Sequence, residues 1–240
     1  MDRETFDYLF PNLVMDLFPI DSGNSAQLQR NDPSLRLSEK ELHELLLYLA
    51  DNVRYTEIAK AATHPNLPET WVRDILRQAK YGTAPQSFDA YTYLVCTLPN
   101  PSLSPELLQE ATDQFLTLTA HGMIPLEMLF TAILINPNTA SRTANMIAEE
   151  TIHHSWVAWK MPTDESRYEA DKLMDGIARN THLTEANVNA YTAWLLNRAR
   201  INNPDRRKAY KNHLKVIAST HYDKLTPESE AGIIGNALLV

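Results

Sequence analysis

Seven basic side chains lie within one short stretch of the C-terminal half, and they form the clearest candidate for binding chemistry. Residues 196–215 contain one acidic residue, Asp205, although acidic residues outnumber Lys and Arg by 30 to 22 in the whole chain. The basic residues are Arg198, Arg200, Arg206, Arg207, Lys208, Lys211 and Lys215. We expect a helix to begin near Pro204, and a helix N-terminus with added Arg side chains is suited to phosphate or carboxylate groups. The alternative is a solvated basic face that balances the acidic remainder or pairs with a neighbouring subunit.

A second candidate contact is aromatic. Trp156 and Trp159 follow Ile152 at i+4 and i+7, a spacing that produces one apolar stripe on a helix and is typical of a core. They also lie at an insertion in the repeat described below, and insertions in helical arrays often lie on the binding face. Both interpretations, a core stripe and a partner contact, stay open.

Metal chemistry is suggested by one pair only. Glu150 and His153 form an E-x-x-H spacing, which places both side chains on one helix face. Carboxylate-bridged di-metal bundles need two such motifs and further glutamates, and the sequence has no second E-x-x-H. Because the same residues also form ordinary i, i+4 pairs with Glu149 and His154, we predict no metal site and no cofactor.

Nucleophilic and nucleotide chemistry are also not supported by the motifs. Cys96, the single cysteine, lies in an apolar helical stretch, where a buried and inert thiol is expected. There is no G-x-S-x-G elbow, no G-x-G-x-x-G loop and no P-loop motif. We therefore predict a protein that is not an enzyme.

The elements that must position these side chains are predicted to be helices. Only 6 of the 240 residues are Gly, which argues against the tight turns of a sandwich or barrel. Three segments instead share one pattern, with their turn prolines 36 residues apart at Pro65, Pro101 and Pro137. The segments are ATHPNLPETWVRDIL (62–76), TLPNPSLSPELLQEA (97–111) and LINPNTASRTANMIA (134–148). Weaker copies occupy 31–45, 177–191 and 219–233, and such a period is typical of a helical solenoid.

Each repeat can be interpreted as two helices joined by a turn. The proline cannot continue the first helix, and a residue such as Ser104 or Thr184 is placed to cap the second. The second helix then shows apolar spacing, as in Trp71 and Ile75. One pair cannot bury its apolar stripe alone, so neighbouring pairs must stack.

The N-P-[NS]-[LT]-[SPA] turn followed by an amphipathic helix resembles the variant leucine-rich repeat and HEAT-like helical arrays of bacterial proteins, over roughly residues 31–235. The resemblance implies an all-α fold of antiparallel helix pairs, stacked as a short right-handed HEAT-like α-solenoid that binds other macromolecules. It implies no catalytic residue. We assign residues 1–30 to an N-terminal capping segment and linker, and 31–240 to the helical repeat domain, with an insertion near 155–168.

These observations predict a scaffold or adaptor that binds a protein partner through the surface of the array. The alternative is a nucleic-acid-binding helical-repeat protein that uses the basic strip. The net charge of −8 and the confinement of the strip to one end disfavour this alternative. The apolar tail at 231–240 either docks on its own array or meets a partner such as a second copy, which would make the protein a homo-oligomer.

The compartment is predicted from the N-terminus and from cysteine usage. Asp2, Glu4 and Asp7 interrupt the apolar residues there, so we expect no signal peptide. The most apolar run, 123–135, contains Pro125 and Glu127 and is too short to cross a membrane, so we expect no membrane partner. With a single cysteine, the expected location is the reducing cytoplasm.

Overall fold

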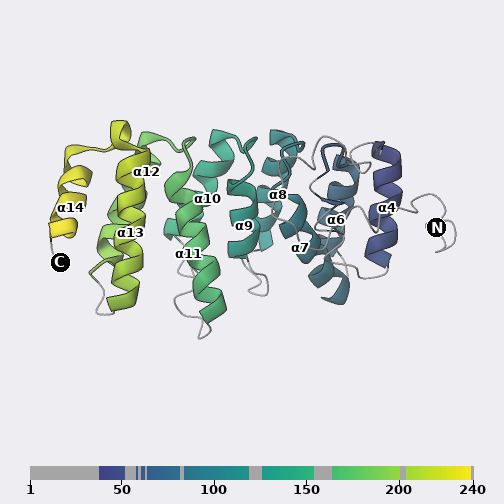
Figure 1. Cartoon of the computed structure of the whole chain (residues 1–240), viewed down its shortest axis with the longest axis horizontal. Coiled ribbons are helices and arrows are strands. Elements are labelled where there is room, and N and C mark those ends of the chain that lie inside the picture. Colours follow the sequence, from purple (N-terminus) through teal and green to yellow (C-terminus); the bar gives the residue numbers. More distant parts are fainter. Residues whose placement is uncertain are drawn as a thin grey trace, which may run out of the picture. The chain divides into compact units, whose positions relative to one another are not determined.

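The computed structural model describes residues 38–51, 58, 61–62, 64–81, 84–118, 126–153, 164–200 and 204–238 (Figure 1). Regular structure within these residues is entirely helical, so the predicted all-α class is confirmed. The α-helices are α4 (Glu39–Asp51), α6 (Glu69–Tyr81), α7 (Ala84–Thr97), α8 (Pro105–Leu118), α9 (Leu126–Leu134), α10 (Ser141–His153), α11 (Asp164–Arg179), α12 (Glu185–Arg198), α13 (Pro204–Thr220) and α14 (Pro227–Leu238). A short 3-10 helix, η3 (Tyr222–Lys224), precedes α14. The predicted capping segment and its boundary at residue 30 lie outside the described residues.

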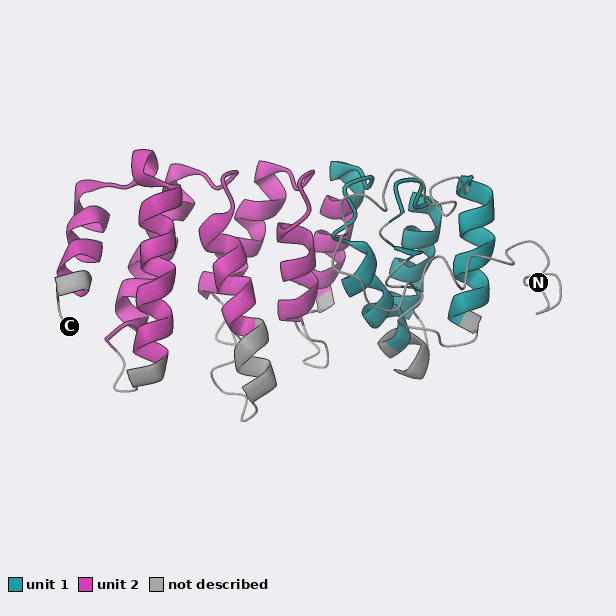
Figure 2. Ribbon diagram, viewed as in Figure 1, with its two compact units in different colours: residues 1–107 teal, residues 108–240 magenta. Residues whose placement is uncertain are grey.

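The chain divides into two compact units, residues 1–107 and residues 108–240 (Figure 2). In unit 1, α6 packs against α7. The rings of Trp71 and Tyr93 lie 6.5 Å apart, and the Tyr91 hydroxyl donates a hydrogen bond of 2.9 Å to the carbonyl of Ala79. Trp71 and Ile75 are buried, as the apolar spacing predicts. These aromatic contacts form part of the core of unit 1, which also contains buried leucines of α4.

Unit 2 contains two rows of packed helices. In one row α9 packs against α11 and α11 against α13, and in the other α10 packs against α12 and α12 against α14. The rows contact each other through α10–α11, α12–α13 and α13–α14. The largest buried side chains of this unit include Phe115, Phe130, Tyr191 and Tyr210. The helices of unit 2 therefore pack both against the helix two places along the chain and, between α12, α13 and α14, against the next helix.

The turns that begin at His64, Asn100, Asn136 and Asn180 share one hydrogen-bond pattern. In each turn the first residue accepts, through its carbonyl, a hydrogen bond from the backbone N–H of the fourth residue, at 3.1–3.3 Å. Its side chain accepts a second bond from the N–H of the third residue, at 2.8–3.0 Å. This is the local turn that Asn favours, and it explains why Asn or His recurs there.

Hydrogen bonds also connect each turn to a neighbouring repeat within the same unit. The Asn100 amide donates to the carbonyl of Ala62 and, at 2.8 Å, to that of His64. In unit 2 the His221 Nε2 lies 3.1 Å from the carbonyl of Ala178. The bonds to Ala62 and Ala178 thus provide side-chain donors for carbonyls near helix ends.

The starts of the second helices confirm the predicted caps. The Ser104 hydroxyl accepts from the N–H of Leu107, and α8 begins at Pro105. The Thr184 side chain accepts from the N–H of Asn187 at the start of α12. In unit 2 these starts lie on one edge, the turn edge, formed by residues 136–140, 180–184 and 221–226 (Figure 1). The helices α9, α11 and α13 run toward this edge, and α10, α12 and α14 run away from it.

Candidate binding surface

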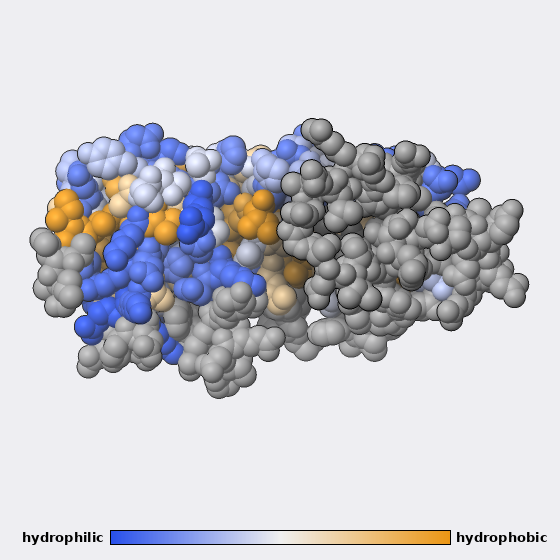
Figure 3. All heavy atoms as spheres, in the orientation of Figure 1, coloured by the Kyte–Doolittle hydropathy of each residue, from blue (hydrophilic) through white to orange (hydrophobic). Residues whose placement is uncertain are grey.

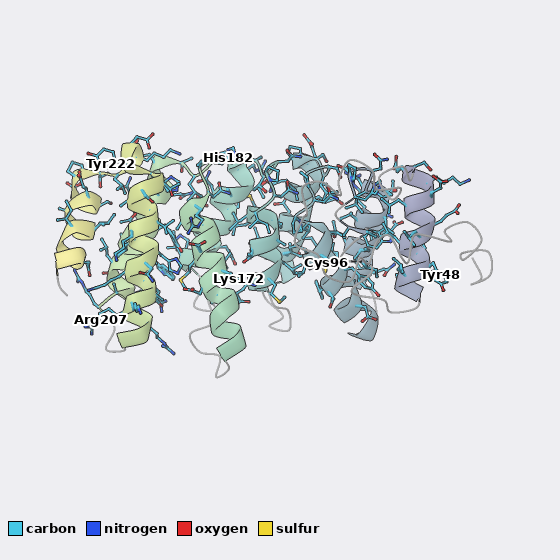
Figure 4. The ribbon with its side chains drawn as sticks, viewed as in Figure 1. Tyr48, Cys96, Lys172, His182, Arg207 and Tyr222 are labelled. Atoms are coloured by element: carbon cyan, nitrogen blue, oxygen red, sulfur yellow. The ribbon has the colours of Figure 1, made fainter. Side chains whose placement is uncertain are left out.

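The predicted basic residues all lie on the last turn of α12, in the residues that follow it, or on α13. In Figure 4, Arg207 lies near the start of α13, far from the turn edge. Tyr222 and His182 lie at the turn edge, at the other end of the helices. Five of the seven form what we call the basic junction, on both sides of the α12–α13 connection. Its members are Arg198, Arg200, Arg206, Arg207 and Lys208. Arg200, Arg207 and Lys208 are exposed, whereas Arg198 and Arg206 are half-buried.

An aromatic cluster positions one member of the basic junction. The Arg198 guanidinium lies over the Trp194 ring, 5.2 Å from its centroid. Trp194 stacks on Tyr191 at 5.6 Å and meets Tyr210 edge-on at 6.3 Å. Because the cluster joins α12 to α13, it fixes the base of the basic junction. Trp194 was not predicted as a site residue, although its i, i+4 spacing from Arg198 is visible in the sequence.

The same cations act on the Tyr210 hydroxyl. Burial raises the pKa of Tyr210 to about 12, while Arg198 and Arg206 act in the opposite direction because cations favour the charged phenolate. Both guanidinium groups therefore lie near this ring. Tyr210 stays neutral at physiological pH and serves as a packing residue under the junction.

Two acidic side chains of the neighbouring helix α11 contact residues that are not part of the basic junction. Asp171 Oδ1 lies 2.7 Å from His213 Nε2 on α13. Asp175 Oδ2 lies 2.6 Å from Arg179 Nε on α11 itself. The first contact connects α11 to α13, and the second lies within α11.

The two remaining basic residues, Lys211 and Lys215, are not part of the basic junction. Their positions can be compared with those of α9 and α11 when the helices are aligned by the first residue of the turn that follows each of them. Lys215 lies six residues before His221, the first residue of the last turn. The corresponding residues of α9 and α11 are Phe130 and Met174, and both are fully buried. Lys211 in turn corresponds to Leu126 and Ala170, which are also buried. Lys211 and Lys215 thus occupy positions where the earlier helices pack against the next helix of their row.

The other predicted candidates are not brought together. Trp156 and Trp159 lie outside the described residues. Glu150 and His153 lie on α10, and within the described residues no group of three or more His, Cys, Asp or Glu side chains could hold a metal ion. Cys96 lies on α7, where burial raises the pKa of its thiol. His64 is a turn residue whose ring nitrogen accepts the Asn66 N–H at 3.0 Å.

No protein-family model matches the chain, and no curated protein or solved structure matches it either. Among the described helices, none is both long enough and apolar enough to span a bilayer. A functional assignment must therefore come from the geometry of the basic junction and of the rows that support it.

Proposed function

We propose that the chain is a non-enzymatic scaffold or adaptor, built as a short HEAT-like α-solenoid, that binds an acidic protein through the basic junction. The two rows of unit 2 support the solenoid assignment, because each helix packs on the helix two places along the chain. The repeated turn bonds support it as well. Arrays of this kind commonly bind other macromolecules through an extended surface.

The observation that carries the proposal is the clustering of five cations on a rigid base. Exposed Arg200, Arg207 and Lys208 present their charges at one end of α13. Arg198 is held in place by Trp194, so less side-chain entropy is lost when it binds a carboxylate. Guanidinium groups form paired hydrogen bonds with carboxylates, which favours an acidic protein surface.

A nucleic acid is the other polyanion that the basic junction would attract. A solenoid that holds a duplex needs cations repeated in register over several helix pairs. In unit 2, however, the second helix α10 carries only one Lys or Arg, Arg142, and α12 only one, Arg198. Together with the net charge of −8, this favours a protein partner.

The test is a pull-down from lysate of the native host, comparing the wild type with an Arg200→Glu/Arg207→Glu/Lys208→Glu variant. The matched control, Arg77→Glu/Arg142→Glu/Lys172→Glu, makes the same change in net charge at exposed positions elsewhere. We expect the junction variant to lose an acidic protein that the wild type and the control both capture. Its affinity should fall about tenfold or more, and added salt should weaken the wild-type complex.

Circular dichroism checks that each variant is folded. Equal capture by the wild type and the junction variant would contradict the proposal and direct attention to the second predicted contact, Trp156 and Trp159. Capture of nucleic acid in place of a protein would favour the alternative function.

A further inference from the structure

The five cations of the basic junction are not equivalent. Arg206 and Arg207 already interact with other groups of the chain. Arg198, Arg200 and Lys208, in contrast, form no ion pair with any residue that the structure describes. Figure 3 shows hydrophilic surface over α13, the helix that carries Lys208. Three cations of the basic junction are therefore available to an anion that is not part of the described chain.

Arg198 differs from Arg200 and Lys208 because it is half-buried. Its guanidinium lies over the Trp194 ring, 5.2 Å from the ring centroid. A cation over an aromatic ring is stabilised by the electrons of the ring face, but this contact uses none of the five N–H donors of a guanidinium. Burying part of such a group without an acceptor is unfavourable, so Arg198 gains the most from an anion partner.

Trp194 can hold Arg198 in one place because several contacts fix its own ring. It stacks on Tyr191, with 5.6 Å between the centroids and 14° between the planes, and it meets Tyr210 of α13 edge-on at 89°. Tyr191 is fully buried, and its hydroxyl donates a hydrogen bond of 3.1 Å to the carbonyl of Met174 on α11. Residues of α11, α12 and α13 therefore support the ring under Arg198.

The geometry of a guanidinium determines which groups it can recognise. It is planar, and two parallel N–H groups on one edge match the two oxygens of a carboxylate. When the face of a guanidinium rests on an aromatic ring, these edge groups stay available for hydrogen bonding. A Lys ammonium carries the same charge but has no such pair of donors. A ring-supported Arg can thus select an acidic group by shape as well as by charge.

We propose that Arg198 is the specificity-determining residue of the basic junction, that it binds one carboxylate of the acidic partner through its paired N–H groups, and that Trp194 is its positioning residue. The inference rests on the proposed function and adds to it the geometry of recognition. Arg200 and Lys208 supply charge, which attracts the partner without selecting the shape of the acidic group. Position 198 therefore requires Arg, whereas Lys serves equally well at position 200.

The test compares two substitutions that conserve charge, Arg198→Lys and its matched control Arg200→Lys. Fluorescence anisotropy measures the binding of fluorescein-labelled poly-glutamate to the full chain, and circular dichroism checks each fold. Arg198→Lys should raise the dissociation constant about tenfold or more, because a paired hydrogen bond is lost, whereas Arg200→Lys should change it about twofold or less. Neither substitution alters the net charge, so added salt should weaken the wild type and both variants in parallel.

A double-mutant cycle tests the role of Trp194. Trp194→Leu should raise the dissociation constant of the wild type about fivefold or more, but should have little further effect when Arg198 is already Lys, because the guanidinium that Trp194 positions is then absent. Damage to the packing of α12 against α13 would instead weaken binding equally in both backgrounds. The cycle thus separates positioning of Arg198 from a purely structural contribution of Trp194.

The inference is overturned if Arg198→Lys binds poly-glutamate as tightly as the wild type, if Arg200→Lys weakens binding equally, or if Trp194→Leu acts alike in both backgrounds. The Arg200→Glu/Arg207→Glu/Lys208→Glu variant distinguishes this failure from that of the proposed function. If it loses poly-glutamate while Arg198→Lys does not, the basic junction binds by charge alone and the proposed function stands. A wild type that does not bind poly-glutamate overturns the inference, and one that binds labelled single-stranded DNA instead overturns the proposed function as well.

Discussion

Asn100 shows what a single turn residue contributes. Its side-chain oxygen accepts the N–H of Ser102, and its amide nitrogen donates to the carbonyls of Ala62 and His64. Asn100 is buried, so water cannot replace these bonds. The residue therefore shapes its own turn and joins it to the turn before.

Replacing Asn100 with Ala should lower the free energy of unfolding by about 1–3 kcal/mol, because the buried carbonyls of Ala62 and His64 and the N–H of Ser102 each lose a hydrogen bond. The matched control is Ser102→Ala, at an exposed position of the same turn, which should change stability by about 0.5 kcal/mol or less. Urea denaturation followed by circular dichroism measures both. Equal effects of the two substitutions would show that the Asn100 side chain does not hold the turns together.

His221 takes the place of Asn in the last turn and makes that turn sensitive to acid. Burial lowers the pKa of His221, and the nearby Lys224 lowers it further, against opposing effects of the Ala178 carbonyl and Asp223. The folded state thus prefers the neutral ring. Below the ordinary histidine pKa of about 6.5 the unfolded chain binds a proton that the folded chain resists, so stability falls as pH drops through this range.

We expect His221→Asn to reduce the loss of thermal stability between about pH 7.5 and pH 5.5, because Asn cannot be protonated there. The control is His182→Asn, an exposed histidine at the turn edge. Melting temperatures of the wild type and both variants at the two pH values give the comparison. A His221→Asn variant that keeps the wild-type pH dependence would mean that other groups control the response.

Two glycines of α14, Gly232 and Gly235, allow the packing of this helix to be tested by substitution with Ala. Helix propensity alone makes Ala more stable than Gly by about 1 kcal/mol within a helix. Gly235→Ala should realise this gain, because its new Cβ meets nothing within 4 Å. Gly232→Ala must displace Leu196 Cδ1, so it should gain less or lose stability.

Chemical denaturation of the two single variants measures this difference directly. The order of stability should be Gly235→Ala above the wild type, and Gly232→Ala below Gly235→Ala. Equal stabilisation by both substitutions would mean that a Cβ at position 232 has more room beside Leu196 Cδ1 than a distance of 2.6 Å leaves.

The starts of helices were the most predictable elements. Pro105 and Ser104 at α8, Thr184 at α12 and Pro204 at α13 act on the residues beside them, so their effect is visible in the sequence. Packing between helices was less predictable. The contact of Trp194 with Arg198 and Tyr210 depends on how α12 meets α13, which local patterns do not specify.

For the whole chain, the all-α class followed from the scarcity of glycine and from the repeated turns. The seven basic residues of 196–215 were predicted to form one surface, but in the structure they form two groups at different positions. Five cations form the basic junction, whereas Lys211 and Lys215 lie at positions where α9 and α11 carry buried apolar residues. That division depends on which positions are buried in α9 and α11, a comparison that needs the packed rows.

The hydrogen-bonded turns have a further consequence for how such a chain can change. Successive turns begin at Asn136, Asn180 and His221, so the segments between them differ in length, yet in each turn the carbonyl of the first residue accepts the N–H of the fourth. Helix α10 ends, and α11 begins, at the edge away from those bonds. The turn edge thus keeps the same backbone hydrogen bond in successive repeats. At the other edge, which bears the basic junction, the connections between helices can be lengthened, shortened or exchanged. A new recognition segment grafted between α10 and α11, or between α12 and α13, would leave the hydrogen bonds of the turn edge intact.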